Sequence, residues 1–234
     1  MNRPGIQFKI DIHNMVIQAN VLKLLEKLRF RRPPKPPYSH VVQLGDPVLR
    51  CKAKIVEKTQ LDTPEFKKLI NNMRKVVKRY KCVGISAPQL GVDLRVMAMT
   101  CPDLDQFAGS PQEYQLKGMQ PYSYSVWVNP SMKVLDYKKE ILSEGCESMR
   151  GFSADVARYS RIQLIGWDER GVEKSEELSG WLARIAQHEL DHLDGRMYLD
   201  IAHLPSLTCS FWDRVNRTGG KVHISYYPNK ILSK

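Results

Sequence analysis

The nine residues Gln187–Gly195 (QHELDHLDG) constrain the structure of this chain more than any other stretch. His188 and His192 are four residues apart, so on an α-helix their side chains lie on one face, about one turn apart. Two imidazoles placed in this way can bind one metal ion, and Glu189 then lies beside the ion without having to be a ligand. A buried helix with two hydrogen-bonded histidines is the alternative, because this spacing also occurs by chance.

The flanking residues predict that this helix faces the protein interior. Ser179 is a suitable N-cap residue, an apolar run follows it, and Gly195 stands where a glycine commonly ends a helix. Trp181 and Ile185 fall on the same helical stripe as the two histidines. The neighbouring stripe is also apolar, which favours a metal site over a solvated acidic surface.

A zinc-type hydrolytic site uses three protein ligands and leaves one position open for water. No glutamate follows Glu189, and Tyr198 stands where a related zinc-protease pattern has its last histidine. Four weak downstream candidates remain for the third ligand: Asp200, His203, Asp213 and His223. Cys146 is the better candidate, because a thiolate and two imidazoles make a soft tetrahedral site with one open position.

The N-terminal residues differ in composition from the rest of the chain. The 234 residues carry a net charge of +11, and residues 1–40 hold eight Lys/Arg against two Asp/Glu. Residues 15–30 predict a basic amphipathic helix, which the prolines of residues 33–37 end. This composition is typical of a transit peptide. We therefore predict a basic extension and linker over residues 1–37 and a catalytic domain over residues 38–234, with an ordinary terminal helix as the alternative.

Cysteine usage and hydropathy indicate a soluble protein in a reducing compartment. The five cysteines are an odd number without a CxxC pair, which argues against a disulfide framework. Cys82 and Cys101 have apolar neighbours and are interpreted as packed thiols. No uninterrupted apolar run approaches the roughly 20 residues that a membrane span needs, so we expect no transmembrane segment.

The hydrophobic pattern predicts an α+β fold. Residues 63–80 predict a second helix with a clear apolar face, formed by Phe66, Leu69, Ile70, Met73 and Val77. Residues 101–124 read as a long loop and residues 168–171 as a hairpin turn. Strands are predicted at residues 95–100, 125–129, 133–142, 161–167 and 172–178, with a short one at 224–227. The expected architecture is mostly antiparallel strands around the central metal-binding helix, with the second helix outside.

Three stretches together resemble the motifs of the peptide deformylases. They are Gly84–Gln89 (GISAPQ), Glu144–Ser148 (EGCES) and His188–Gly195 (HELDHLDG), and their order and spacing are also similar to those of the family. The resemblance covers residues 40–205. It implies a metal-dependent hydrolase that removes the formyl group from N-formyl-methionine at the start of new polypeptides and releases formate.

The resemblance also implies roles for individual residues. Cys146, His188 and His192 would bind the metal, and metal-bound hydroxide would attack the formyl carbon with Glu189 as general acid and base. The developing oxyanion would be met by the metal, the Gln89 side chain and the backbone N–H of Glu147. Without the family, the alternative for Gln89 is a loop amide that caps local backbone. Such a soft ligand set accepts Fe(II), Zn(II), Co(II) or Ni(II).

We expect an extended substrate to pass close to the backbone of the motifs. Gly84 and Gly145 allow such an approach because they have no side chain. The methionine side chain would enter an apolar pocket lined by Ile85, Trp181 and Ile185. Glu144, also assigned to the substrate region, is expected to pair with a neighbour such as Arg150 or to orient the ligand loop.

Two features resemble the animal mitochondrial branch of the family and imply the mitochondrial matrix. One is Glu147, where most bacterial members have leucine, and the other is the basic N-terminal extension. If the Glu147 side chain flanks the substrate, its exposed charge changes binding by about 0.2–1 kcal/mol and modestly favours peptides with a basic residue after methionine. The expected partners are N-formyl-methionyl nascent polypeptides; a transient ribosome contact and a homodimer are further hypotheses, and no DNA partner is expected.

Two other functions are compatible with the residues alone. An ordinary zinc endopeptidase would take its third ligand from the downstream Asp or His residues. An RNA- or ribosome-binding module would have structural histidines, no bound metal, and an affinity that falls steeply with salt.

Overall fold

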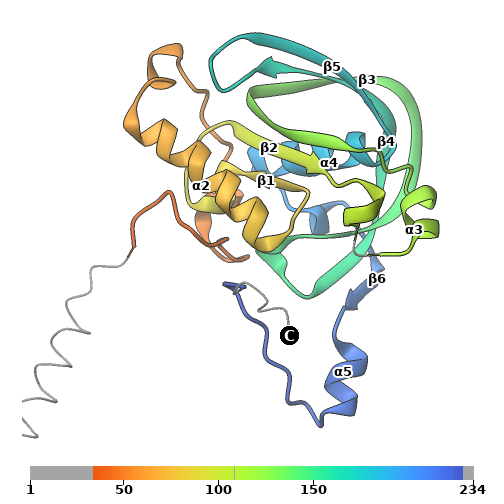
Figure 1. The fold of residues 1–234 in the computed structure, drawn as a ribbon. Helices are drawn as coiled ribbons and strands as arrows, with labels where there is room; N and C mark the ends of the chain where they lie inside the picture. The colour runs from red at the N-terminus through yellow and green to blue at the C-terminus, as the bar shows by residue number, and fades with distance from the viewer. Residues whose placement is uncertain (1–33, 108, 229–234) are drawn as a thin grey trace, which may run out of the picture. The chain divides into compact units, whose positions relative to one another are not determined.

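The computed structural model describes residues 34–107 and 109–228 of the chain (Figure 1). The described residues from Pro36 onward belong to one compact unit. The helix predicted at residues 15–30 and most of the proposed N-terminal extension lie outside the described residues. Within the described part, no helix is both long enough and apolar enough to cross a membrane.

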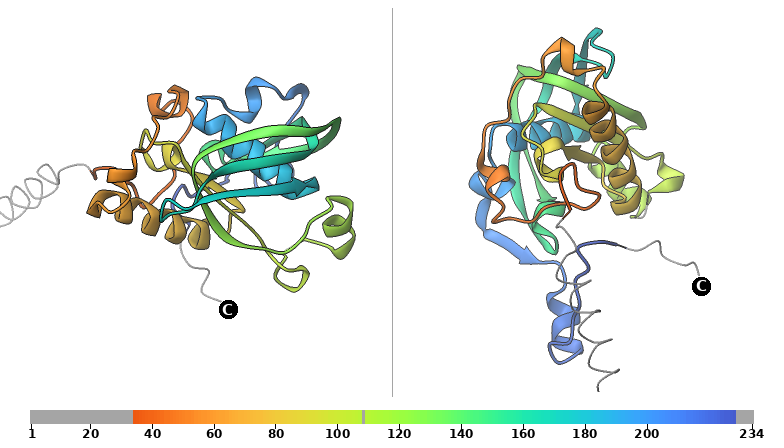
Figure 2. Two further views of the ribbon diagram at one scale, coloured as in Figure 1. Left: turned by 90° about the horizontal axis from the view of Figure 1, so that it is seen from above. Right: turned by 90° about the vertical axis from the view of Figure 1, so that its left-hand side faces the viewer.

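The centre of the fold is an antiparallel sheet with the strand order β1-β2-β3-β4-β5, in which β6 pairs with β4. Its strands are β1 (Gly84–Ser86), β2 (Val96–Cys101), β3 (Tyr122–Gly145), β4 (Phe152–Trp167), β5 (Glu173–Ser179) and β6 (His203–Cys209). The helices are α2 (Pro64–Tyr80), α3 (Pro111–Leu116), α4 (Gly180–Leu193) and α5 (Trp212–Arg217). Figures 1 and 2 show α4 partly enclosed by the strands and α2 outside them. This arrangement confirms the predicted α+β fold.

The sheet separates two hydrophobic clusters because successive residues of a strand face opposite sides. On β2, Val96 and Ala98 pack in the cluster of α2, whereas Met97 and Met99 pack in the cluster of α4. All four side chains are fully buried. A strand covered on both faces must be apolar throughout, which explains the uninterrupted VMAM run. Helix α4, which carries His188 and His192, therefore lies against one side of β2, and the predicted outer helix α2 lies against the other.

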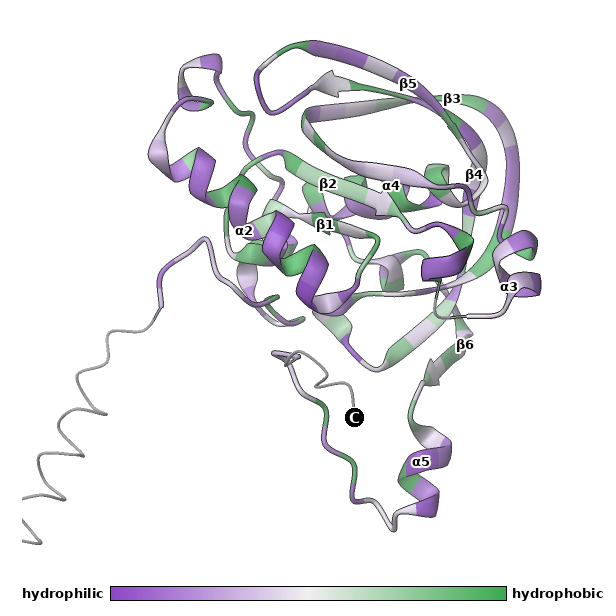
Figure 3. Cartoon of the chain, in the orientation of Figure 1, coloured by the Kyte–Doolittle hydropathy of each residue, from purple (hydrophilic) through white to green (hydrophobic). Residues whose placement is uncertain are grey.

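The predicted α2 is confirmed in its bounds and its buried face. Thr63 is its N-cap and accepts a hydrogen bond from Phe66 N at 3.3 Å, and Pro64 occupies the first turn. Figure 3 shows hydrophilic and hydrophobic residues alternating around this helix. The predicted apolar residues are all buried: Phe66, Leu69, Ile70, Met73 and Val77. Each fully buried side chain of this size stabilises the fold by about 1.5–3 kcal/mol.

The ends of α4 agree with the prediction in position but not fully in mechanism. Ser179 is the N-cap residue, but its side chain makes no capping hydrogen bond. At the other end, Gly195 has a φ of 72° and follows the C-cap residue Asp194. A Cβ at Gly195 would overlap the backbone of Arg50 and Cys51. Glycine is therefore required there both for its backbone conformation and for space.

The two strands predicted at residues 125–129 and 133–142 are one continuous strand, β3, so the predicted break was wrong. At the Asn129-Pro130 step, the pairing with β4 shifts register between Val128 and Ser131. Asn129 has a φ of 51°, and its side-chain amide exchanges two hydrogen bonds of 2.9 Å with the backbone of Val56. This bulge lets a proline lie within the strand without breaking the sheet.

Three local predictions need correction. The long loop at residues 101–124 contains α3, capped by Ser110 with Pro111 in its first turn, and it runs into β3. The tail contributes β6, which the sequence did not predict. No strand forms at residues 224–227, where the Tyr226 carbonyl instead accepts a hydrogen bond from Tyr80 Oη at 2.6 Å. The hairpin turn at residues 168–171 is confirmed between β4 and β5.

Candidate active site

Cys146, His188 and His192 come together from two distant parts of the chain. Cys146 follows the last residue of β3 and is the N-cap of the short helix η5 (Glu147–Met149), while both histidines lie on α4. One ligand atom of each residue lies within 4.8 Å of the others. The group contains none of the downstream candidates; Asp200, for example, is paired with Arg50 at 2.5 Å.

The three side chains fit a transition metal ion by their chemistry and their orientation. Cys146 Sγ lies 3.2 Å from His192 Nε2, as expected for two donors that point to one centre. His188 Nδ1 lies 2.9 Å from Glu144 Oε2. The Nε2 atom of His188 is therefore left to coordinate a metal ion. A thiolate with two imidazoles is a ligand set that suits soft or borderline divalent ions.

Glu144 is buried behind His188 and is held by two arginines. Arg158 forms two hydrogen bonds of 2.9 Å with its oxygens, and Arg184 donates a third at 2.7 Å. Burial disfavours the ionised carboxyl, but the hydrogen bonds with His188 and Arg158 outweigh burial and hold the pKa of Glu144 well below its ordinary value. The alternative in which Glu144 pairs with Arg150 is wrong, because Arg150 lies against Glu147 instead.

Glu189 is buried next to the group formed by Cys146, His188 and His192, and it faces Gly84. Glu189 is only 3% exposed, and its Oε2 atom has no hydrogen-bond partner among the described residues. Burial raises the pKa of Glu189 to about 7. A carboxyl with this pKa can accept and return a proton near neutral pH. A Cβ at Gly84 would overlap the carboxylate, so glycine at this position makes room for it.

Gln89 caps local backbone with one end of its amide and lies close to Cys146 with the other. It lies in the short helix η3 (Ala87–Leu90), and its Oε1 accepts hydrogen bonds from Ser86 N at 2.9 Å and Ser86 Oγ at 3.0 Å. These contacts cap local backbone and fix the amide. Its Nε2 then points to the other side, toward Ser148 Oγ at 3.2 Å and Cys146 Sγ at 3.5 Å.

The family model of polypeptide deformylases matches residues 38–206. The chain belongs to the peptide deformylase family. The mitochondrial peptide deformylase of Homo sapiens is 44% identical over 184 residues, which cover 79% of this chain and 76% of the relative. The chloroplastic/mitochondrial peptide deformylase 1A of Arabidopsis thaliana is 39% identical over 162 residues, which cover 68% of this chain and 60% of the relative. The peptide deformylase structure from Thermotoga maritima superimposes with a TM-score of 0.58 at 31% identity, covering 70% of this chain and 97% of that one.

These matches confirm the family that the three motifs indicated. Peptide deformylases are metal-dependent hydrolases that remove the N-formyl group from nascent polypeptides. The match spans η3, the loop around Cys146 and α4, so all three motifs of this deformylase lie within it.

The deformylase has a pocket of about 370 Å³ whose wall includes Cys146 and His188. Gly84, Gly145, Trp181 and Ile185 line it as predicted, and Glu144 reaches its wall. Ile85 does not line it, which corrects the predicted methionine pocket: its side chain is fully buried in the α2 cluster. In the three-residue strand β1, Ile85 faces α2, and its neighbours Gly84 and Ser86 therefore face α4.

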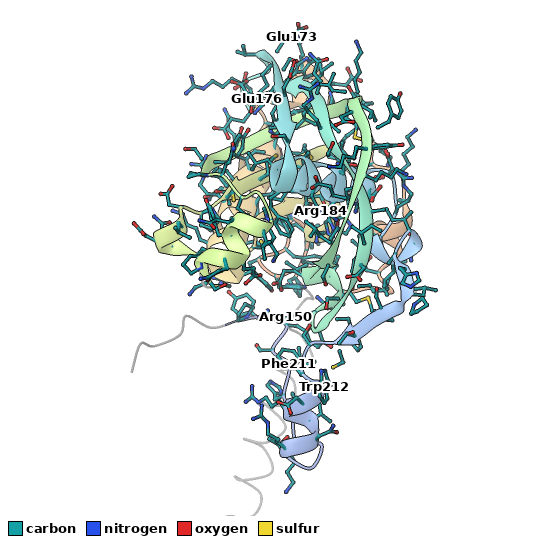
Figure 4. All side chains as sticks on the ribbon, turned by 90° about the vertical axis from the view of Figure 1, so that its right-hand side faces the viewer. Arg150, Glu173, Glu176, Arg184, Phe211 and Trp212 are labelled. Carbon is teal, nitrogen blue, oxygen red and sulfur yellow. The ribbon has the colours of Figure 1, made fainter. Side chains whose placement is uncertain are left out.

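The pocket wall also contains residues that the sequence did not assign to the site. They are Lys81, Cys82, Val83, Arg150, Gly151, Phe152, Ser153, Arg184 and Ser210. In the view of Figure 4, Arg184 lies within the body of the molecule and Arg150 lies nearer the end that carries Phe211. Arg184 could have been noticed, because it is a charged residue in an otherwise apolar run four positions before His188. Arg150 and Ser210 carry no comparable signal.

Proposed function

We propose that this deformylase acts in the mitochondrial matrix on N-formyl-methionyl nascent polypeptides and that residues 1–37 are its transit peptide and linker. The names of the human and Arabidopsis relatives support the compartment. The basic, acid-poor composition of the first 40 residues supports the targeting role. The transient ribosome contact and the homodimer stay predictions from the sequence.

We infer that Cys146, His188 and His192 hold one divalent ion, with Fe(II), Zn(II), Co(II) and Ni(II) as the candidates. Such an ion, when bound, polarises the formyl carbonyl and makes water a better nucleophile near neutral pH. The closeness of the three ligand atoms supports this assignment. Glu144 acts on the ligand rather than on the substrate in this proposal, because both of its oxygens are engaged by protein groups.

Glu189 is the proposed general acid and base. Its buried carboxylate accepts the proton of the attacking water and returns it to the nitrogen of the leaving amine. The oxygen of the formyl group receives a hydrogen bond from Gln89 Nε2, which is held in place because Ser86 fixes the other end of the amide. The backbone N–H of Glu147, next to Cys146 on the same loop, is the second proposed donor.

The proposed substrate path runs between the backbone of β1 and the backbone at the end of β3. The formyl-methionine chain passes between Gly84 on β1 and Gly145 at the end of β3, where the absence of side chains leaves room for peptide backbone. Its methionine side chain packs between Trp181 and Ile185 on α4. Val83, rather than Ile85, provides the apolar surface on the β1 side.

The closeness of the ligand atoms of Cys146, His188 and His192, beside the buried Glu189 at the pocket wall, supports this function most strongly. The direct test is formate release from a formyl-Met-Ala-Lys peptide by the purified full-length chain. We expect formate release to stop after chelation and to return when Fe(II), Co(II) or Ni(II) is added. No formate release by metal-loaded protein would contradict the proposed activity, and cleavage of internal peptide bonds would indicate an endopeptidase.

A further inference from the structure

A buried cluster of four charged residues lies directly behind His188. Glu144, Arg158, Arg184 and Asp191 are each at most 5% exposed. Two carboxylates and two guanidinium groups balance to zero charge. Buried charges are tolerated when they are paired and hydrogen-bonded in this way, and the loss of one partner leaves a costly uncompensated charge.

Arg184 joins this cluster to the two strands on either side of the metal cysteine. Its Nη1 donates to Glu144 Oε1 at 2.7 Å and to the Val156 carbonyl of β4 at 2.8 Å. Its Nη2 donates to the Glu140 carbonyl of β3 at 2.7 Å. Arg184 lies four residues before His188 on α4, so one helix carries both the arginine and the ligand.

Through these contacts Arg184 restricts the movement of Glu144. Among the described residues, Glu144 is the only hydrogen-bond partner of His188 Nδ1. Glu144 Oε1 accepts from Arg184 and Arg158, and Oε2 accepts from Arg158 and lies 2.9 Å from His188 Nδ1. A carboxylate held at both oxygens keeps one orientation, and the imidazole that donates to it keeps one as well. His192 Nδ1, in contrast, has no hydrogen-bond partner among the described residues.

We propose that Arg184 is a positioning residue of the metal site: it anchors Glu144 to β3 and β4, and through Glu144 it fixes the His188 ring for metal binding. This inference rests on the proposed metal ligands. Arg184 then raises the affinity for the metal ion even when no peptide is bound. Because Arg184 also lines the pocket, turnover alone would not separate this effect from a contact with substrate.

The test measures Co(II) affinity of the full-length chain without peptide, by competition with a chelator, and records the visible absorption of the bound ion. We expect Arg184→Leu to bind Co(II) about 10- to 100-fold more weakly, the range typical for loss of a group that orients a metal ligand. Arg184→Lys should also bind more weakly, since one ammonium cannot reach Glu144 and both strand carbonyls together. The absorption spectrum should change as well, because the His188 ring is less restricted.

Arg95 provides a matched control. It also joins α4 to β3, with hydrogen bonds to Asp194 Oδ1 at 2.7 Å and to the Pro130 carbonyl at 3.1 Å, but it does not contact Glu144. Arg95→Met should lower the midpoint of thermal unfolding and keep the Co(II) affinity and spectrum of the unaltered chain. An equal loss of affinity in Arg95→Met would overturn the proposal, because the effect would then be one of general stability.

A charge-balanced variant covers the case in which the single substitutions at Arg184 do not fold. Arg184→Met with Asp191→Asn leaves Glu144 and Arg158 as a neutral buried pair, and it should still bind Co(II) more weakly. Unchanged affinity in a folded variant lacking Arg184 would refute the positioning role. If instead Cys146→Ala bound Co(II) like the unaltered chain, the proposed ligand set itself would be wrong.

Discussion

Glu189 is the residue in which burial and proton chemistry are most closely linked. Its carboxyl is enclosed by the pocket wall and by the Gly84 backbone, and burial raises its pKa to about 7. A divalent cation held by the neighbouring histidines would favour the ionised form and act in the opposite direction. The side chain therefore lies where both protonation states are accessible during a hydrolytic cycle.

Replacing this carboxylate should separate metal binding from catalysis. We predict that Glu189→Gln keeps its metal, because Glu189 is not among the three ligands, and that its turnover falls by about 10²- to 10⁴-fold, the usual range for loss of a general base. Metal content and formate release measured on one sample check this. Glu177→Gln, on the exposed side of β5, should behave like the unaltered chain. Normal turnover of Glu189→Gln would assign the proton transfer to another group.

Glu147 was expected from the sequence to favour basic substrates, but the structure adds a neighbouring charge. Arg150 Nη1 lies 3.4 Å from Glu147 Oε2, and both side chains line the pocket. The guanidinium offsets the carboxylate, so we now predict little discrimination between formyl-Met-Lys and formyl-Met-Glu peptides. Removing Arg150 should reveal the preference for the basic peptide.

The size of this preference follows from the energy of an ion pair near the surface. An interaction of about 0.2–1 kcal/mol corresponds to a change of at most about fivefold in kcat/KM. Arg150→Met should therefore favour the lysine peptide by this factor, most clearly at low salt, and Arg150→Met with Glu147→Leu should not. Equal kcat/KM ratios in these two variants would mean that the Glu147 carboxylate does not reach the substrate.

Among the elements, the regular helices could be predicted from the sequence. Strand features that depend on contacts between distant residues could not. The periodic apolar positions of α2 and α4 are local signals, as are Thr63, Pro64 and Gly195 at their ends. The continuation of β3 through Pro130 depends instead on Asn129 contacting Val56, 73 residues earlier in the chain. No local pattern contains that contact.

The candidate site likewise contains features that the sequence could predict and features that it could not. Cys146 could be favoured as a ligand by the chemistry of thiolates and by the lack of a glutamate after Glu189, and the structure brings it to the histidines. The direction of Ile85 could not be predicted, because a three-residue strand has no periodicity to reveal which face is buried. The β1–β2 pairing decides that Ile85 faces α2 and Gly84 faces the pocket.

The close approach of β1 to α4 predicts different effects at two pocket glycines. Gly84→Ala would place a methyl group onto the Glu189 carboxylate, whereas the Cβ of Gly145→Ala would make an ordinary contact of 3.4 Å with the Phe152 carbonyl. We predict that Gly84→Ala loses about 1–3 kcal/mol of unfolding free energy and that Gly145→Ala loses less. Urea unfolding of both variants tests this; equal losses would mean that α4 and β1 can move apart freely.

For the molecule as a whole, the proposed division between an N-terminal targeting segment and the enzyme can be tested by truncation. The described residues from Pro36 onward form a compact unit with its own core. We predict that a chain starting at Pro36 keeps the deformylase activity, and that the full-length chain enters mitochondria whereas the shortened one does not. Activity assays test the first part of this prediction, and localisation of fluorescent fusions tests the second. Cytosolic full-length protein would contradict the targeting role, and an unfolded shortened chain would place the segment within the enzyme.

One metal ion held by Cys146 and the two α4 histidines is proposed to drive deformylation. The most direct measurement is the metal content and formate release of Cys146→Ala, compared with Cys82→Ala, which alters another cysteine of the same pocket. We predict that Cys146→Ala loses both tightly bound metal and turnover while it remains folded, and that Cys82→Ala keeps both. Full metal occupancy with normal formate release in Cys146→Ala would contradict the claim.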